Sequence, residues 1–240
     1  MKKGRILSVE TMGLVDGPGI RTVVFFQGCA LRCSFCHNPD SWDCSAGEVV
    51  DADVLMKKIL RFRPYFVRSG GGVTFSGGEP LLQSDFLLEM LKMCKVENIH
   101  TCIDTAGVGN GCYSEILSLT DLVLYDVKAT DAEMYRKICG ADIRETEIFQ
   151  KALADSGTDT IVRQVIIPGI NDSDEYMSGL KKYIEKNIPS AVKVELLPYH
   201  LMGVHKYAKM GIEEPLKHTP AMDSSVTDEF WKKYFCKEEQ

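Results

Sequence analysis

The feature that most constrains the fold is a regular alternation of short apolar runs with amphipathic stretches. Six runs rich in β-branched and aromatic residues predict strands at 23–26, 73–76, 100–105, 122–128, 160–167 and 192–197. Segments with helical spacing separate these runs. Strands joined by helices pair in parallel through right-handed crossovers, and six units are too few to close an eight-stranded barrel. The sequence therefore predicts an α/β fold, an open (β/α)6 partial barrel.

One domain is expected over residues 1–240, because no linker, repeat or low-complexity segment divides the chain. Its core is expected at about 15–200 and a C-terminal extension at about 211–240. Outside the six units we predict a leading strand at 4–9, an irregular segment at 42–50, a helix from Asp51 that ends at Pro64, and a last helix at 226–235.

Three cysteines follow the first predicted strand directly. Cys29, Cys33 and Cys36 have the spacing C-x3-C-x2-C. Thiolates on so short a loop can converge on one soft metal centre. A cubane iron–sulfur cluster has four irons that are usually held by four protein thiolates, so three would leave one iron open for a small molecule.

Other interpretations of this loop stay open at this point. A zinc site could use the three cysteines with His37, since zinc accepts Cys3His ligation. Disulfides are disfavoured because three close cysteines leave one unpaired. The remaining cysteines are scattered singly and are expected to be reduced, partly buried small residues: Cys44, Cys94, Cys102, Cys112, Cys139 and Cys236.

The cysteine loop and its flanks resemble the radical S-adenosylmethionine superfamily, with Phe35 just before the last cysteine. The segments 16–21 (DGPGIR), 26–29 (FQGC) and 36–39 (CHNP) are similar to those of the glycyl-radical-enzyme activating enzymes. The resemblance runs from Gly4 to about Gly211. It implies an oxidoreductase that cleaves S-adenosylmethionine reductively at a [4Fe–4S] cluster and generates a glycyl radical on a partner enzyme.

Polar groups and glycines gather where the predicted strands end. They include Gly78 and Glu79, then Asp104 with Thr105, Asp126 with Lys128, Arg163, and His200. Ligands of parallel α/β folds bind at the carboxyl ends of the strands. We therefore expect these residues to line one site together with the cysteine loop.

Each of these residues suits one bound S-adenosylmethionine. A bare Gly78 lets the backbone approach the ligand closely, and Glu79 could pair with its ammonium group. Asp126 and Lys128 share one face of their strand and could equally form a buried ion pair. The resemblance implies ligand contacts from Phe35, Cys36, His37, Gly78, Glu79, Asp126, Val127, Lys128, Arg163 and His200.

Two further assignments come from the resemblance. Asp104, Thr105 and the carbonyl of Leu124 would hold a monovalent cation, for which oxygen atoms are suitable ligands. A helix N-cap at Asp104 or Thr105 is the alternative. Asp16 would face the partner protein.

Composition limits the partners. The chain has 28 Lys and Arg against 34 Asp and Glu, a net charge of −6, so there is no overall basic field for nucleic acid. No apolar run approaches the ~20 residues of a membrane span, and the N-terminus has no signal-peptide pattern. We expect a cytoplasmic protein.

Cys44 is the only cysteine between Cys36 and Gly77. This segment therefore has no room for the cysteine-rich, ferredoxin-like insertion of many related activating enzymes. This absence favours pyruvate formate-lyase as the glycyl radical enzyme, and the resemblance implies a flavodoxin or ferredoxin as electron donor. The alternatives are another glycyl radical enzyme, a radical S-adenosylmethionine enzyme acting on a small molecule, and a zinc-binding adaptor without catalysis.

Overall fold

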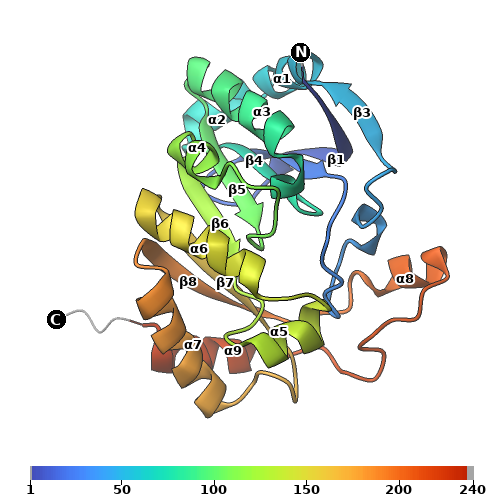
Figure 1. The fold of residues 1–240 in the computed structure, drawn as a ribbon, viewed down its shortest axis with the longest axis vertical. Helices are drawn as coiled ribbons and strands as arrows, with labels where there is room; N and C mark the ends of the chain where they lie inside the picture. Colours follow the sequence, from blue (N-terminus) through green and yellow to red (C-terminus); the bar gives the residue numbers. More distant parts are fainter. Residues whose placement is uncertain (1, 237–240) are drawn as a thin grey trace.

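A computed structural model describes residues 2–236 of the chain. In this part of the chain eight strands form one sheet in the order β3-β1-β2-β4-β5-β6-β7-β8 (Figure 1). Six of them are parallel, namely β2 (Arg21–Phe26), β4 (Gly72–Gly77), β5 (His100–Thr105), β6 (Leu122–Asp126), β7 (Thr160–Ile166) and β8 (Ala191–Pro198). From β2 to β8 these six strands follow one another in the sheet in chain order, as in a barrel wall. The predicted partial barrel is confirmed.

Two antiparallel strands extend the sheet beyond β2. The long strand β1 (Lys3–Gly13) pairs with β2, and β3 (Glu48–Asp51) pairs with the start of β1. The prediction of an irregular segment up to residue 50 was therefore wrong for Glu48 to Val50. Four residues are too few to show a strand period, and the partner of β3 lies more than forty positions earlier in the chain.

Helices form the outer layer of the molecule. They are α1 (Ala52–Leu60), α2 (Arg63–Ser69), α3 (Ser84–Val96), α4 (Tyr113–Ser118), α5 (Ala132–Cys139), α6 (Arg144–Ser156), α7 (Asp174–Asn187), α8 (Val204–Met210) and α9 (Ser224–Tyr234), with short 3-10 turns η1 (Pro39–Ser41) and η2 (Pro80–Gln83). Helices α1, α3, α4, α6, α7 and α9 contact one another in that sequence along the sheet (Figure 1). Their apolar faces and the sheet enclose the main core.

The first helical segment differs from the prediction. Helix α1 ends at Leu60, and Pro64 lies in the first turn of α2 instead of ending α1. Proline is tolerated there because the first turn of a helix has no partner for the backbone N–H that proline lacks. The proline therefore marks the start of a new helix, and the previous helix has already ended four residues before it.

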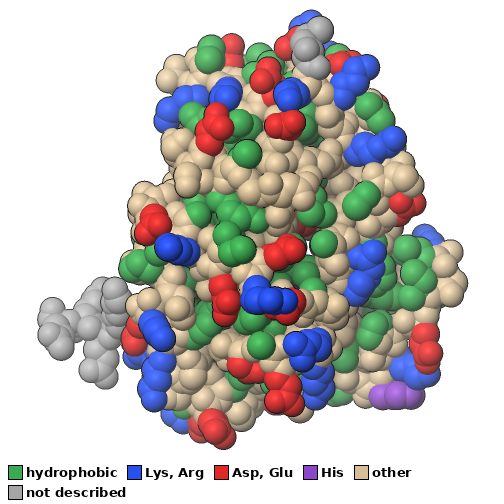
Figure 2. All heavy atoms as spheres, viewed as in Figure 1, with side chains coloured by type: hydrophobic (Ala, Val, Ile, Leu, Met, Phe, Trp, Pro, Cys, Tyr) green, Lys and Arg blue, Asp and Glu red, His purple; other side chains and the backbone are tan. Residues whose placement is uncertain are grey.

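The last helix protects one edge of the sheet. Trp231 of α9 donates from Nε1 to the carbonyl oxygen of Val194 in β8 at 2.8 Å. None of the helices in residues 2–236 combines the length and apolar character needed to cross a membrane. On the face shown in Figure 2, basic and acidic side chains are interspersed, and neither sign forms a continuous patch.

Candidate active site

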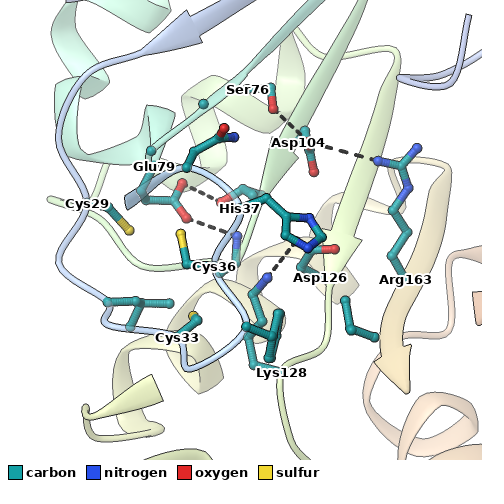
Figure 3. A pocket seen from close by; sticks show the side chains of 18 of the residues that line it. Cys29, Cys33, Cys36, His37, Ser76, Glu79, Asp104, Asp126, Lys128 and Arg163 are labelled. Carbon is teal, nitrogen blue, oxygen red and sulfur yellow. Dashed lines mark hydrogen bonds and ion pairs between the residues drawn. The ribbon is translucent and has the colours of Figure 1, made fainter. Parts of the chain in front are cut away.

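A cavity of about 300 Å³ opens at the carboxyl ends of the parallel strands (Figure 3). The predicted site residues that line it are Asp16, Cys29, Cys33, Phe35, Cys36, His37, Gly78, Glu79, Asp104, Thr105, Asp126, Lys128, Arg163 and His200. The cysteines lie on one side of this cavity, and Asp104 and Arg163 lie on the other (Figure 3). Two predicted residues, Val127 and Leu124, do not line it. Their side chains are buried in the apolar core.

The cysteine loop is fixed by backbone hydrogen bonds on both sides. Its start is held where the N–H of Glu79 donates to the carbonyl oxygen of Gly28 at 2.8 Å. Its middle is held where Arg32 N and Ser34 N donate to the carbonyl oxygens of residues 139 and 138, at 2.9 and 2.8 Å. Gly28 has a φ of 100°, which an L side chain rarely adopts, so glycine permits the turn into the loop.

Burial favours the protonated form of the three thiols. It raises the pKa of Cys29 to about 12 and also raises the pKa of Cys36. A hydrogen bond to Cys139, together with burial, raises the pKa of Cys33. Metals bind the thiolate form of cysteine, so a metal centre at these cysteines would have to displace their protons. The sequence did not single out Cys139, although its sulfur lies 3.7 Å from that of Cys33.

The zinc alternative required His37 as a fourth ligand beside the cysteines. The His37 ring instead stacks on the His200 ring with 3.9 Å between centroids, and His37 Nε2 lies 3.0 Å from the carbonyl oxygen of His200. Across residues 2–236, no three His, Cys, Asp or Glu side chains converge closely enough to hold a single metal ion. A cubane needs no such convergence, because its irons are separate atoms held by separate thiolates.

Glu79 is an organising residue of the site. Its side chain is 1% exposed, and its carboxylate accepts hydrogen bonds from Leu81 N at 3.2 Å, Thr105 Oγ1 at 2.5 Å and Ala106 N at 2.9 Å. Burial raises its pKa to about 7. The carboxylate therefore ties the end of β5 to the turn after β4, and it faces the cavity with a charge that a cationic ligand group would stabilise.

A second polar group lies across the cavity. Asp104 accepts a hydrogen bond from Ser76 Oγ at 2.7 Å, and its carboxylate is 3.9 Å from Arg163 Nη1. Arg163 also pairs with Glu195 at 3.1 Å and donates to the carbonyl oxygen of Val15 at 2.7 Å. Ser76 and Glu195 carried no signal in the sequence beyond their place on strands. Their partners come from neighbouring strands, and only the sheet register brings them together.

The Asp126–Lys128 ion pair that the sequence left as an alternative is present. Lys128 Nζ lies 2.7 Å from Asp126 Oδ2 and 5.2 Å from the centroid of the Phe35 ring. Lys128 lies just beyond β6, which ends at Asp126, so the expected strand was two residues too long. The alternative of a helix N-cap at Asp104 or Thr105 is wrong, because the next helix begins only at Tyr113.

The cavity satisfies the chemical needs of a [4Fe–4S] cluster and a zwitterionic ligand. Three thiols on one wall supply the soft ligands that iron–sulfur clusters require. Carboxylates and cations on the other walls offer partners for the ammonium and carboxylate groups of an amino acid. The cavity volume also falls within the usual range of small-molecule sites.

Comparison with known proteins shows the family. The Radical SAM superfamily matches residues 23–179. A curated relative from Clostridium pasteurianum, the pyruvate formate-lyase-activating enzyme, is 56% identical over 223 residues, 93% of this chain and 93% of that protein. The chain belongs to the pyruvate formate-lyase-activating enzymes of the radical SAM superfamily. The pyruvate formate-lyase 1-activating enzyme of Escherichia coli K12 is 42% identical over 216 residues, 89% of this chain and 87% of that protein.

Solved structures agree on the fold. A radical SAM methyltransferase from Sphaerobacter thermophilus matches with a TM-score of 0.62 at 16% identity, over 95% of this chain and 74% of that one. A domain of pyruvate-formate lyase-activating enzyme from Bacteroides vulgatus matches with a TM-score of 0.54 at 22% identity, over 68% of this chain and 91% of that one. At these identities the likeness concerns the architecture alone.

Proposed function

We propose that this enzyme activates pyruvate formate-lyase by generating a glycyl radical on it. The observation that carries the proposal is the 56% identity to a pyruvate formate-lyase-activating enzyme over nearly the whole length of both chains. The cavity supports it, because three cysteines and a set of charged groups line one space at the carboxyl ends of the strands.

In this proposal Cys29, Cys33 and Cys36 hold a [4Fe–4S] cluster. When bound, the cluster supplies one electron that cleaves S-adenosylmethionine to methionine, and a hydrogen atom of the partner glycine is transferred to the adenosyl fragment. The remaining residues bind and orient. Glu79 would accept the ammonium group of the ligand, and Lys128 or Arg163 would balance its carboxylate. The backbone beside Gly78 would lie along the ligand.

The adenosine end of the ligand would lie near the stacked rings of His37 and His200. Phe35 and the backbone of Cys36 complete that wall of the cavity. Tyr207 supports it from behind by donating to the carbonyl oxygen of Cys36 at 2.9 Å. Val127 would contribute only backbone atoms, because its side chain is 2% exposed and lies in the core.

The proposal also covers the monovalent cation and the partners. Asp104, Thr105 and the carbonyl of Leu124 would hold the cation, although Ser76 and Arg163 already contact Asp104 Oδ2. Asp16 lines the cavity and would meet the incoming glycine segment. A cytoplasmic flavodoxin or ferredoxin would deliver the electron.

An anaerobic activation assay tests this function. Protein reconstituted with iron and sulfide, then supplied with a reductant and S-adenosylmethionine, should convert inactive pyruvate formate-lyase to the active form. The variants Cys29→Ala, Cys33→Ala and Cys36→Ala should lose the cluster and the activation, whereas Cys94→Ala should keep both. Activation that persists in any one of these three single variants would refute the proposal.

A further inference from the structure

A fourth sulfur atom lies against one of the three thiols assigned to the cluster. Cys139 is the last residue of α5 and has no exposed surface. Its sulfur lies 3.7 Å from the sulfur of Cys33, within the range of a hydrogen bond between thiols. The proposed function assigns no role to Cys139.

The contact is held in place by the backbone on both sides of Cys33. Arg32 N donates to the carbonyl oxygen of Cys139 at 2.9 Å, and Ser34 N donates to that of Ile138 at 2.8 Å. These bonds fasten the loop to the end of α5 at the two residues that flank Cys33. These backbone hydrogen bonds hold the cysteine loop and the end of α5 side by side. The two sulfur atoms are therefore brought together by the positions of their backbones.

Apolar side chains pack around this sulfur pair, and the charged groups that act on Cys33 are Lys128 and Asp126. Cys33 and Cys139 belong to one buried cluster with Leu31, Ile138 and Tyr199. A hydrogen bond in such a setting is electrostatically stronger than one in water. Water is also kept from competing for the sulfur of Cys33, which is only 8% exposed.

The direction of the hydrogen bond follows from the chemistry of iron binding. In the cofactor-free protein the Cys33 thiol donates to Cys139. A cysteine that binds iron is a thiolate and has no proton to donate, so only the Cys139 thiol can then be the donor. We propose that Cys139 donates a hydrogen bond to the iron-bound Cys33 thiolate and thereby raises the reduction potential of the cluster. Such bonds stabilise the more negative, reduced state.

This inference rests on the proposed function only in that Cys33 binds the cluster. The test is a redox titration of the full-length, cluster-loaded protein followed by spin resonance. Cys139→Ala and Cys139→Val both remove the donor, and Val also fills the space. Both should lower the reduction potential, by up to roughly tenfold in the equilibrium constant for reduction, or about 59 mV for a one-electron couple. Cys139→Ser keeps a donor and should remain closer to the unmodified protein.

Cys94→Ala is the matched control, because Cys94 is also fully buried but lies in α3, outside the cavity lining. Its potential should equal that of the unmodified protein. Equal potentials in the unmodified, Ala and Val proteins would overturn the inference, as would an equal shift in the Ala and Ser variants. Unmodified protein that binds no cluster would overturn the proposed function as well, so iron and sulfide content separates the two failures.

Discussion

The buried Glu79 allows a quantitative test of the electrostatics of the site. Burial raises its pKa from 4.5 to about 7 in the folded, cofactor-free protein. Because the folded state then holds this proton more tightly than the unfolded state, the associated stability is full below about pH 4.5 and is lost as the pH rises through about 7. Between pH 5 and pH 8 this single group should reduce the free energy of unfolding by about 2.5 kcal/mol.

Glu79→Gln removes the titration and keeps the shape of the side chain. Its amide retains one acceptor oxygen for Leu81 N and Thr105 Oγ1, but its NH2 group then faces the N–H of Ala106. We expect a loss of about 1–3 kcal/mol from that unpaired donor. The loss of stability between pH 5 and pH 8 should be about 2.5 kcal/mol smaller in the variant than in the unmodified protein.

Urea unfolding of cofactor-free protein, kept reduced and followed by tryptophan fluorescence, measures both effects. Other titrating groups are present in both proteins and cancel in the comparison, except Asp104, whose own pKa is raised to about 6 by burial and whose charge raises the pKa of Glu79. Glu115→Gln, on the exposed side of α4 where Glu115 pairs with Lys92 at 3.0 Å, is the control for the loss of a carboxylate. Identical pH profiles for the unmodified protein and Glu79→Gln would refute the reasoning.

Two further predictions concern the walls of the cavity. A Cβ at residue 78 would lie 2.1 Å from the carbonyl oxygen of Gly28. Gly78→Ala should therefore displace the cysteine loop, cost about 1–3 kcal/mol of stability and reduce the iron content after reconstitution. Unchanged iron content would contradict this prediction, and Gly179→Ala, with open space around it, is the control. Lys128→Met removes the hydrogen-bonded partner of Asp126, whose side chain is 27% exposed, and should cost about 2 kcal/mol near pH 7. Lys128→Met with Asp126→Leu should recover this loss. Equal unfolding midpoints in urea for the single and double variants would contradict the ion-pair account.

The sequence predicted the parallel part of the fold because its signal is local. Each of the six strands is a short apolar run that ends at glycine or polar residues, and these ends mark the site. The antiparallel edge was missed at β3 (Glu48–Asp51), because its pairing depends on a distant partner at the start of β1. Pro64 was predicted to end a helix but lies in the first turn of α2, because proline is tolerated in the first turn of a helix as well as after its end.

Within the site, the motifs predicted most of the residues that line the cavity. They were less informative about the hydrogen bonds and contacts that those residues make. Glu79 was expected to meet a ligand, and its carboxylate already accepts three hydrogen bonds from the chain. Val127 was included with its neighbours, although its side chain is buried in the core while Asp126 and Lys128 line the cavity. Cys139 reaches Cys33 across 106 positions of sequence, which no spacing rule could indicate.

The most direct test of the central claim is an anaerobic spin-resonance measurement of the glycyl radical. Reduced, cluster-loaded protein would be mixed with S-adenosylmethionine and pyruvate formate-lyase from the same cell. We predict a glycyl-radical signal on pyruvate formate-lyase and matching release of 5′-deoxyadenosine, both lost in Cys33→Ala and retained in Cys94→Ala. Protein with a full cluster that gives neither the radical nor 5′-deoxyadenosine would contradict the account.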